Sequence, residues 1–350
     1  KFCPLHRGHQ LLLDHAQAAC AQLIVVSYTK PEFAGMEPQR REQWLRSLYP
    51  GAQHWVLDDA RLAAHCQRLG LPKRALPDND ASDAVHRLFM AWLLREVIRQ
   101  QVDVVFSSED YGPGFAEVLS QQQQLHGGTA VVHVAVDPAR RTVPISGTAL
   151  RTDLHAQRQQ LAPQVYRHFV KRVVLLGGES TGKSTLAQRL AECCGSVHAA
   201  EYGRELWEAN NGQLQEADLL HIAQTQIARE EALLETASTW LACDTSPLTT
   251  LMYAQAMFGR ADPLLLALST RHYDLVLLCA PDVPFVQDGT RRDADFRRWQ
   301  HGWYLRELEA RQVPYRQLRG SWQQRETTAL AAMAELQQAG YQATAAPPVQ

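Results

Sequence analysis

The chain has 350 residues, 45% hydrophobic and 21% charged, which is typical of a folded protein with enough residues for two cores. Its formal net charge of −2 provides no basic face of the kind that nucleic-acid binding requires. No apolar run approaches the roughly 18 residues of a membrane span, and no signal peptide is recognisable, so we expect no membrane association. The seven cysteines show no CxxC or zinc-type spacing, which favours free thiols in a reducing cytoplasm.

Short apolar, β-branched runs alternate with helical patterns along the chain, which predicts parallel βαβ units and an α/β fold. In the first half we expect strands at 23–28, 54–57, 102–107 and 130–136, and helices at 8–21, 39–48, 83–100, 113–123 and 147–169. In the second half we expect strands at 172–176, 197–200, 239–243, 275–279 and 315–318, and helices at 183–194, 214–237, 247–258, 263–271, 296–311 and 324–339. The resulting domains are 1–168 and 169–342, followed by a loose tail at 343–350.

The first candidate functional segment comprises residues 1–9 (KFCPLHRGH). A segment of this kind ordinarily follows a β-strand, so we expect the natural protein to have a strand ahead of Lys1. His6 and His9 are three residues apart, with Gly8 between them. If a helix begins at Gly8, both imidazoles lie at its N-terminus, where free N–H groups and the helix dipole favour phosphate. They can then donate hydrogen bonds to a triphosphate as pyrophosphate leaves. The alternative is two histidines that cap an ordinary helix.

A second candidate segment, residues 145–151 (ISGTALR), follows the last strand expected in the first half. Ser146 suits a helix N-cap, and Thr148 lies in the first turn. Arg151 lies one to two turns further on, where its fork of N–H donors can reach the same phosphates. The alternative for this segment alone is a plain capped helix.

Residues 177–184 (GGESTGKS) match the Walker A pattern in full, follow an expected strand and open an expected helix. In such a loop successive N–H groups form a nest for anions, Lys183 reaches β- and γ-phosphate oxygens, and Ser184 is a ligand for Mg²⁺. The sequence therefore predicts a second ATP site, formed by Gly177, Gly178, Glu179, Ser180, Thr181, Gly182, Ser184 and Thr185.

Two further segments fit this second site. Asp244 ends an apolar strand, where a carboxylate can act on the metal or on the acceptor hydroxyl, although Ser246 and Pro247 would also let it cap a helix. Arg291 and Arg292 follow Asp288 in a loop of the kind in which arginines of small-molecule kinases close over the transferred phosphoryl group. The alternative for this loop is a solvated run of charges.

The segment 201–205 (EYGRE) follows the second strand of this half, where acceptor substrates of such kinases bind. The carboxylate of Glu201 can hold ribose hydroxyls, and Tyr202 can stack on a ring. Arg204 lies two residues further on. The alternative is a helix N-terminus that is rich in acidic residues.

Together these segments carry a resemblance to known proteins. Residues 6–9 and 145–151 resemble the H/TxGH and ISxTxxR motifs of the nucleotidyltransferase superfamily. GGESTGKST, EYGRE, CDTSPLTT and DGTR resemble, in order and approximate spacing, the NadR family of bifunctional nicotinamide-mononucleotide (NMN) adenylyltransferases and ribosylnicotinamide kinases. The likeness covers nearly the whole chain. It implies two doubly wound parallel-sheet domains, a Rossmann-like nucleotidyltransferase followed by a P-loop kinase.

The resemblance also implies the reactions and the residues. The second domain would use ATP and Mg²⁺ to phosphorylate nicotinamide riboside, and the first would join the resulting NMN to AMP, giving NAD and pyrophosphate. It implies catalytic roles for His6, His9, Arg151, Lys183, Asp244 and Arg291. It implies further ATP contacts from Phe2, Pro4, Gly8, Ser146, Thr148 and Arg292, and metal ligation by Ser184 and Asp244. It implies substrate contacts from Arg41, Trp44, Glu201, Tyr202, Arg204 and Asp288.

One departure from the family concerns residues 77–86, the segment that in NadR proteins stacks a tryptophan on the nicotinamide ring. Here it contains no aromatic residue, and Trp55 and Trp92 are the candidates to replace it. The resemblance is compatible with a homo-oligomer.

Two alternatives stay open: an NAD- or ATP-sensing regulatory protein in which only the kinase is active, and a fused adenylyltransferase-kinase for another ribosyl or pantetheine-like metabolite.

Overall fold

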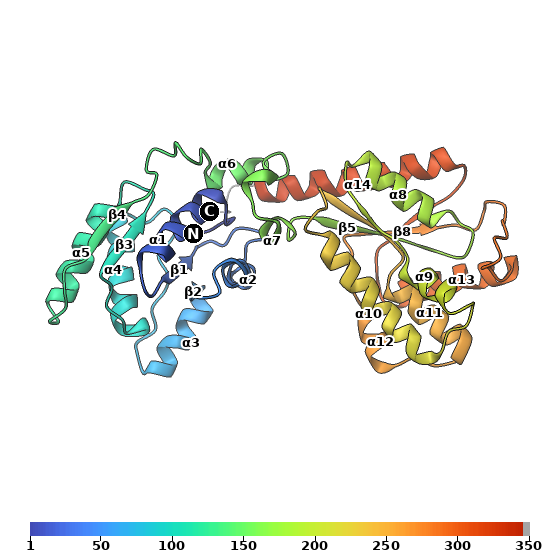
Figure 1. The fold of residues 1–350 in the computed structure, drawn as a ribbon, viewed down its shortest axis with the longest axis horizontal. Helices are drawn as coiled ribbons and strands as arrows, with labels where there is room; N and C mark the ends of the chain where they lie inside the picture. The colour runs from blue at the N-terminus through green and yellow to red at the C-terminus, as the bar shows by residue number, and fades with distance from the viewer. Residues whose placement is uncertain (346–350) are drawn as a thin grey trace. The chain divides into compact units, whose positions relative to one another are not determined.

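The computed structural model describes residues 1–345. It divides into two compact units, one comprising Lys1–Val165 and residues 343–345, the other Tyr166–Gln342. Each unit combines parallel strands with helices, which confirms the predicted two-domain α/β fold (Figure 1). Residues 343–345 of the expected tail are helical, and residues 346–350 lie outside the described residues. Within the described chain, no helix has both the length and the apolar character needed to cross a bilayer.

The strands of the first unit form two parallel pairs. Strand β1 (Ile24–Tyr28) pairs with β2 (Gln53–Leu57), and β3 (Val104–Ser107) pairs with β4 (Val132–Ala135). The longer helices are α1 (Arg7–Ala19), α2 (Pro38–Leu48), α3 (Asp59–Leu69), α4 (Asp83–Trp92) with the π-helical segment Leu93–Ile98, and α5 (Gly112–Gln124). Buried side chains from α3, α4 and α5 form the core against these strands.

In the first unit, two helical segments differ from the sequence prediction. The first is helix α3, which was not expected. Asp58 caps this helix by accepting a hydrogen bond from the backbone N–H of Arg61 at 2.6 Å. The side chains of Leu62 and Cys66 pack into the core. The expected helix at 147–169 is instead divided into α6 (Gly147–Thr152), a 3-10 turn (Arg158–Gln160) and α7 (Pro163–Tyr166). Pro163 disfavours helical geometry at the preceding residue, so a continuous helix is interrupted there.

The second unit contains a five-stranded parallel sheet in the order β6-β7-β5-β8-β9. Its strands are β5 (Lys171–Gly177), β6 (His198–Ala199), β7 (Trp240–Asp244), β8 (Leu275–Cys279) and β9 (Arg316–Leu318). Its helices are α8 (Lys183–Cys193), α9 (Tyr202–Ala209), α10 (Glu216–Leu233), α11 (Pro247–Phe258), α12 (Pro263–Leu268), α13 (Ala294–Ala310) and α14 (Trp322–Ala345). The central strands are almost entirely buried, as expected for a parallel sheet covered on both faces. Ligands of such sheets bind at the carboxyl ends of the strands.

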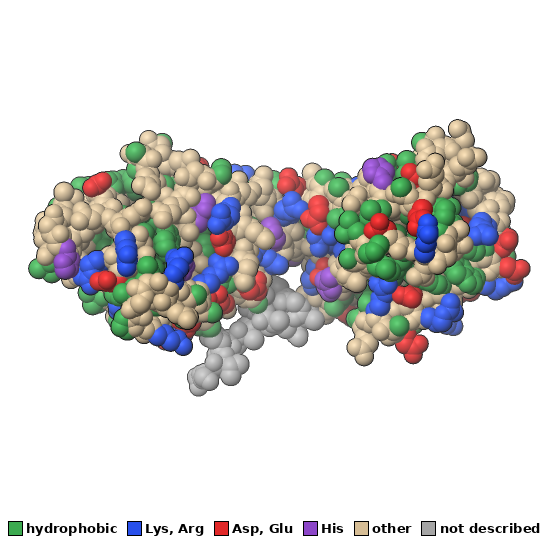
Figure 2. All heavy atoms as spheres, turned by 90° about the horizontal axis from the view of Figure 1, so that it is seen from below, with side chains coloured by type: hydrophobic (Ala, Val, Ile, Leu, Met, Phe, Trp, Pro, Cys, Tyr) green, Lys and Arg blue, Asp and Glu red, His purple; other side chains and the backbone are tan. Residues whose placement is uncertain are grey.

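The distribution of surface charge and the state of the cysteines agree with what the composition predicts. On the face that Figure 2 shows, acidic and basic side chains are interspersed, as the small net charge leads one to expect. All seven cysteines, which lie within the described residues, are free thiols.

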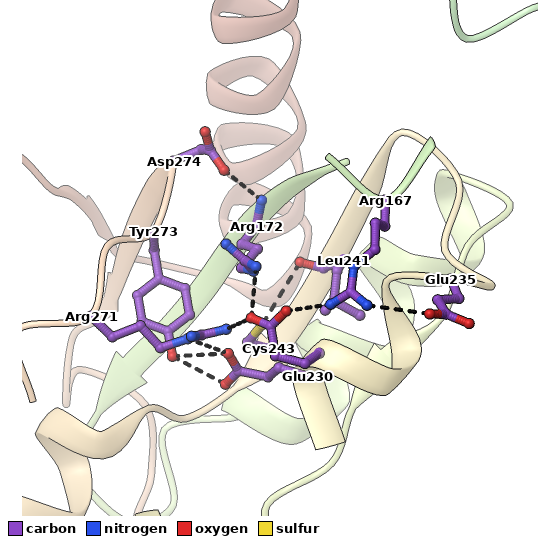
Figure 3. A network of polar contacts seen from close by, with 10 residues as sticks. Arg167, Arg172, Glu230, Glu235, Leu241, Cys243, Arg271, Tyr273 and Asp274 are labelled. Carbon is purple, nitrogen blue, oxygen red and sulfur yellow. Dashed lines mark hydrogen bonds and ion pairs between the residues drawn. The ribbon is translucent and has the colours of Figure 1, made fainter. Parts of the chain in front are cut away.

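A buried polar network fastens the segment that enters β5 to helix α10 (Figure 3). The side chain of Glu230 on α10 has no exposed surface and accepts hydrogen bonds from Arg271 at 3.0 Å and from the Tyr273 hydroxyl at 3.0 Å. The neighbouring Glu231 accepts from Arg271 at 2.6 Å and from Arg167 at 2.5 Å. Burial raises the pKa of Glu230 to about 7, and the positive charge of Arg271 opposes this rise.

This raised pKa predicts a pH-dependent component of stability. The pKa of Glu230 in the folded protein exceeds its ordinary value of 4.5, so its contribution is fully present below pH 4.5 and is lost as the pH rises through about 7. We expect Glu230→Gln to remove this component, so that the unfolding free energy falls less between about pH 5 and 7 than in the wild type. Urea unfolding at both pH values measures this difference. The control is Glu235→Gln, which removes a carboxylate that is more exposed than Glu230 and that pairs with Arg167. If the unfolding free energy of Glu230→Gln depends on pH as in the wild type, the prediction is wrong.

Candidate functional sites

The two histidines of the first unit form a reciprocal cap at the N-terminus of α1. His6 Nδ1 accepts a hydrogen bond from the backbone N–H of His9, and His9 Nδ1 accepts one from the backbone N–H of His6, each at 3.4 Å. Their rings stack with centroids 3.7 Å apart. The capping role considered from the sequence is therefore present. Because Nδ1 is the acceptor, each neutral ring carries its proton on Nε2, which is the donor nitrogen of the ring.

Both imidazoles are held in the neutral form. Burial, assisted by the positive charge of Arg140, lowers the pKa of His6 to about 4. Burial, followed by the charge of His6, lowers the pKa of His9 well below its ordinary value. Near pH 7 these rings therefore act as hydrogen-bond donors rather than as cations. Arg140, which pairs with Glu109 at 2.7 Å, was not predicted from the sequence as a residue of this site. The one feature that could have indicated it is its position shortly before residues 145–151.

The start of α6 lies next to the start of α1. Ser146 is the N-cap of α6, and Arg151 in its second turn donates to the carbonyl oxygen of Cys3 at 2.6 Å and to the Thr148 hydroxyl at 3.0 Å. A Cβ atom added at Gly147 would lie 3.2 Å from the same Cys3 oxygen. The structure thus brings residues 145–151 against the segment that contains the two histidines.

Arg41 and Trp44, for which the family resemblance implied substrate contacts, are buried in the structure. Arg41 and Trp44 of α2 are both 0% exposed, and the Arg41 guanidinium donates to the Glu32 carboxylate at 2.9 and 3.0 Å. In this arrangement neither side chain presents a surface to a substrate, because α2 packs both toward the protein interior. Phe2 and Pro4 are likewise buried, beside the two histidines.

The two tryptophans considered for ring stacking are each occupied by another side chain. The ring of Trp92 lies under the guanidinium of Arg74, 4.7 Å from its centroid. The ring of Trp55 packs against His65 with centroids 5.0 Å apart. Neither placement identifies a partner for a nicotinamide ring.

In the second unit, the β5–α8 loop has a geometry that only glycine satisfies. Gly177 has φ of 143°, and a Cβ atom added there would lie 2.8 Å from the carbonyl oxygen of Cys279. A Cβ atom added at Gly178 would lie 2.8 Å from the carbonyl oxygen of Arg297. Lys183, the first residue of α8, donates to the carbonyl oxygen of Gly178 at 3.0 Å. The lysine that a Walker A motif directs at phosphate is therefore already folded over its own loop.

Side chains from distant helices hold this loop, and sequence reasoning missed all of them. Gln300 of α13 accepts from the backbone N–H of Glu179 at 2.8 Å, and the Tyr253 hydroxyl of α11 donates to the Glu179 carboxylate at 3.1 Å. Arg325 of α14 is 2% exposed and donates to the carbonyl oxygen of Thr181 at 3.0 Å. No local motif predicts these contacts, because the residues are 74 to 144 positions away.

Asp244 lies at the carboxyl end of β7, next to the P-loop strand, since it pairs in register with Leu175. It is 3% exposed, and its Oδ1 atom has no hydrogen-bond partner among residues 1–345. The cap of α11 is Ser246, whose hydroxyl accepts from the N–H of Leu248 at 3.2 Å. The capping role that the sequence allowed for Asp244 is thus filled by another residue. Burial, followed by the negative charge of Asp244, raises the pKa of Glu201.

The residues at this site fit a magnesium ion that arrives with the nucleotide. Among residues 1–345, no group of three or more His, Cys, Asp or Glu side chains is arranged to hold a metal ion. Mg²⁺ in phosphate-binding sites takes one or two protein oxygens and completes its shell with phosphate and water. The Ser184 hydroxyl beside the cavity and the unpartnered Asp244 oxygen are donors of this kind.

A cavity of about 440 Å³ extends from the P-loop to helices α9, α10 and α11. This volume is in the range of small-molecule sites, roughly 300–1,000 Å³. The P-loop end is lined by Gly177 and residues 179–185, and the far end by Trp207, Leu214, Leu219, Ile222, Met252 and Met257. Polar side chains lie between, among them Glu201, Arg204, Gln226, Thr249 and Thr250. The cavity is therefore charged at one end and apolar at the other.

The loop that carries the candidate lid arginines borders this cavity. Asp288 pairs with Arg291 at 2.9 Å and with Arg204 of α9 at 3.4 Å. The backbone N–H of Arg292 donates to Glu179 of the P-loop at 2.8 Å. The structure thus brings the sequence-predicted residues of the loop, α9 and the P-loop to one site.

The aromatic residues that line the cavity are Trp207 and Tyr253, and Tyr202 is not among its lining residues. The Tyr202 hydroxyl is 3.2 Å from His221 Nε2, and the Arg229 guanidinium lies 5.4 Å from the Tyr202 ring centroid, so this side chain is engaged outside the cavity lining. Trp207 lies on the same helix, and Gly212 packs against its indole. Recognising the short helix α9 in the sequence would have placed Trp207 and Gly203 about one turn apart, on one face.

Comparisons with known proteins agree with this architecture. An AAA domain family model matches residues 172–325. The trifunctional NAD biosynthesis/regulator protein NadR of Escherichia coli (strain K12) is 28% identical over 302 residues, 83% of this chain and 70% of the relative. The NadR protein of Salmonella typhimurium is 28% identical over 303 residues, with the same two shares.

Two solved structures share the fold. A crystal structure of NadR protein in complex with NR has a TM-score of 0.68 and 21% identity, covering 96% of this chain and 93% of that one. A crystal structure of NadR protein in complex with NAD and AMP-PNP has a TM-score of 0.67 and 20% identity, covering 100% and 95%. The whole described chain, rather than one domain alone, therefore has a counterpart of known fold.

Proposed function

With the resemblance to the NadR family confirmed over most of the chain, we propose that this protein catalyses two consecutive steps of NAD salvage. The domain at 169–342 transfers the γ-phosphoryl group of ATP to nicotinamide riboside, giving NMN. The domain at 1–168 transfers AMP from a second ATP to NMN, giving NAD and pyrophosphate. The observation that carries the proposal is the presence in one chain of two phosphate-binding helix N-termini, those of α1 and α8, each with its own set of donors.

In the kinase step, the 5′-hydroxyl oxygen of the riboside attacks the γ-phosphorus, the bond from that phosphorus to the β–γ bridging oxygen breaks, and ADP leaves. The Asp244 carboxylate accepts the proton of the attacking hydroxyl through the oxygen that does not hold the metal. Lys183 and Arg291 donate to the phosphate oxygens as charge shifts toward ADP. Ser184 and Asp244 would hold Mg²⁺, which supplies positive charge to the β- and γ-phosphates. Closure of the loop at 288–292 excludes water.

In the adenylyl-transfer step, a phosphate oxygen of NMN attacks the α-phosphorus of ATP and pyrophosphate leaves, so that no enzyme nucleophile is needed. The Nε2–H groups of His6 and His9, together with Arg151, donate to the triphosphate as negative charge builds on the leaving group. Because burial keeps both rings neutral, they provide these donors without a change of protonation.

The cavity accounts for the choice of a riboside as acceptor. Glu201 and Arg204 lie where ribose hydroxyls need polar partners, close to the catalytic carboxylate. Trp207, Leu219 and Met257 provide an apolar end for a planar ring. The ligands of the two solved relatives, NR in one and NAD with AMP-PNP in the other, support the same substrate class.

The test is Lys183→Ala in the full-length protein, with both reactions assayed. Riboside phosphorylation should disappear, because the β- and γ-phosphates lose their ammonium donor, whereas NAD formation from added NMN should persist. Lys73→Ala, at an exposed lysine of the first domain, should leave both activities unchanged. Loss of adenylyl transfer together with kinase activity in folded Lys183→Ala would refute the assignment of two sites. A wild-type protein that phosphorylates the riboside but forms no NAD would favour the regulatory alternative.

A further inference from the structure

The cavity of the second unit contains a hydrogen-bond donor without a partner. Gln226 of α10 lines the cavity and is 1% exposed, and its Nε2 atom has no hydrogen-bond partner within the described residues. Leaving a buried amide donor unpaired costs about 1–3 kcal/mol. Such an atom, on a residue that lines a ligand-sized cavity, points to a group of the ligand that accepts from it.

The orientation of this amide follows from its other contact. Gln226 Oε1 accepts a hydrogen bond from the backbone N–H of Tyr202 at 3.0 Å. Only the oxygen of a side-chain amide can accept from an N–H, so the NH₂ group must occupy the opposite side. Tyr202 is the first residue of α9, where backbone N–H groups have no partner within the helix. The bond therefore satisfies a helix end and at the same time fixes the direction of Nε2.

Gln226 lies where the apolar and charged parts of the cavity meet. Ile222 and Leu219 precede it on α10 by four and seven residues, so the three side chains share one face of the helix, and all three line the cavity. The α9 end that Gln226 contacts follows directly on Glu201, whose pKa is raised by burial and by Asp244.

We propose that Gln226 is a specificity-determining residue of the acceptor site, and that its Nε2–H donates to an oxygen of the acceptor riboside. That oxygen is either the carbonyl of the ring carboxamide or a ribose hydroxyl. This inference rests on the proposed kinase function, in which a riboside is the acceptor. A site built to hydrogen-bond a substrate group disfavours analogues that lack it, because its own buried group is then left unpaired.

The experiment compares Gln226→Glu with Gln226→Met in the full-length protein. Glutamate keeps the size of the side chain and an oxygen for the Tyr202 N–H, but replaces the unpaired N–H donor by an acceptor. Methionine offers no N–H donor and no amide oxygen. For both variants we expect kcat/KM for nicotinamide riboside to fall by about tenfold or more, mainly through KM, with the KM for ATP unchanged. Gln224→Glu, at an exposed glutamine of the same helix, is the matched control and should behave as wild type.

Three ribosides identify the oxygen that is recognised: nicotinamide riboside, nicotinic acid riboside and a pyridinium riboside without a ring substituent. If Nε2–H contacts the carboxamide, the wild type prefers the first over the third, and Gln226→Met abolishes that preference. If it contacts a ribose hydroxyl, the KM of all three rises in Gln226→Met and their ratios stay fixed. A wild-type KM for every riboside in both variants would overturn the inference while leaving the kinase proposal intact. A wild-type protein that phosphorylates no riboside would overturn both.

Discussion

Asp244→Asn should lower the rate of riboside phosphorylation by roughly 10²–10⁴-fold while the melting temperature moves little. Asparagine preserves the size of the side chain and its capacity to cap a helix, but it removes the negative charge and the basic oxygen. Asp244 does not act as a cap, since Ser246 fills that position, and its Oδ1 atom is buried without a partner. The expected loss therefore reports on the reaction and not on the fold. Single-turnover rates with saturating ATP, together with thermal melting, measure both quantities.

An aspartate that does cap a helix provides the control for this substitution. Asp262 accepts a hydrogen bond from the N–H of Leu264 at 2.7 Å at the start of α12, and asparagine is an equally good cap. Asp262→Asn should therefore retain both stability and kinase activity. Near-normal phosphorylation by Asp244→Asn would return Asp244 to a structural role, and would leave Lys183 and Arg291 as the candidates for catalysis.

His9→Ala should lower the rate of NAD formation from NMN and ATP by about 10²–10³-fold, the size expected for removing one transition-state donor. The ring of His9 is neutral and its proton lies on Nε2, so the substitution removes a hydrogen bond rather than a charge. Riboside phosphorylation by the same protein should stay near the wild-type rate, because the kinase residues lie in the other unit. Initial rates of both reactions in the full-length protein check this expectation.

His9 also contributes to the cap of α1, so the comparison needs a variant with an intact cap. His15 lies on the exposed side of the same helix, and His15→Ala should keep the wild-type rate of NAD formation. The melting temperature of His9→Ala shows how much of its effect comes from the helix end. Normal NAD formation by folded His9→Ala would reduce the histidine to its capping role.

The sequence predicted best those parts of the sites in which chemistry and backbone geometry reside in one contiguous segment. The P-loop is the clearest example, because positive φ at Gly177 and the close approach of Cys279 leave room only for glycine. Gln300, Tyr253 and Arg325 hold the same loop from three other helices. Their side chains have no signature of their own, and only the folded arrangement brings them to the loop.

Other differences arose where tertiary packing decides which way a side chain faces. Arg41 and Trp44 lie in the helix that the family resemblance indicated, yet burial against the core directs both inward. Helices α3 and α9 were not recognised in the sequence, although both are amphipathic and α9 is only eight residues long. Ring stacking was assigned to Tyr202, whereas the aromatic residues that line the cavity are Trp207 and Tyr253.

A single oxygen atom connects an arginine beside the proposed acceptor site to an arginine of the candidate lid loop. Asp288 Oδ2 lies 2.9 Å from Arg291 and 3.4 Å from Arg204, so it cannot move toward one guanidinium without leaving the other. An acceptor that draws Arg204 toward its own hydroxyls therefore changes the position of Arg291 at the phosphoryl end. Water molecules also accept from Arg204, but they do not hold its guanidinium in one fixed position. We expect this shared oxygen to make phosphoryl transfer respond to occupancy of the acceptor site, and so to limit wasteful hydrolysis of ATP when that site holds only solvent.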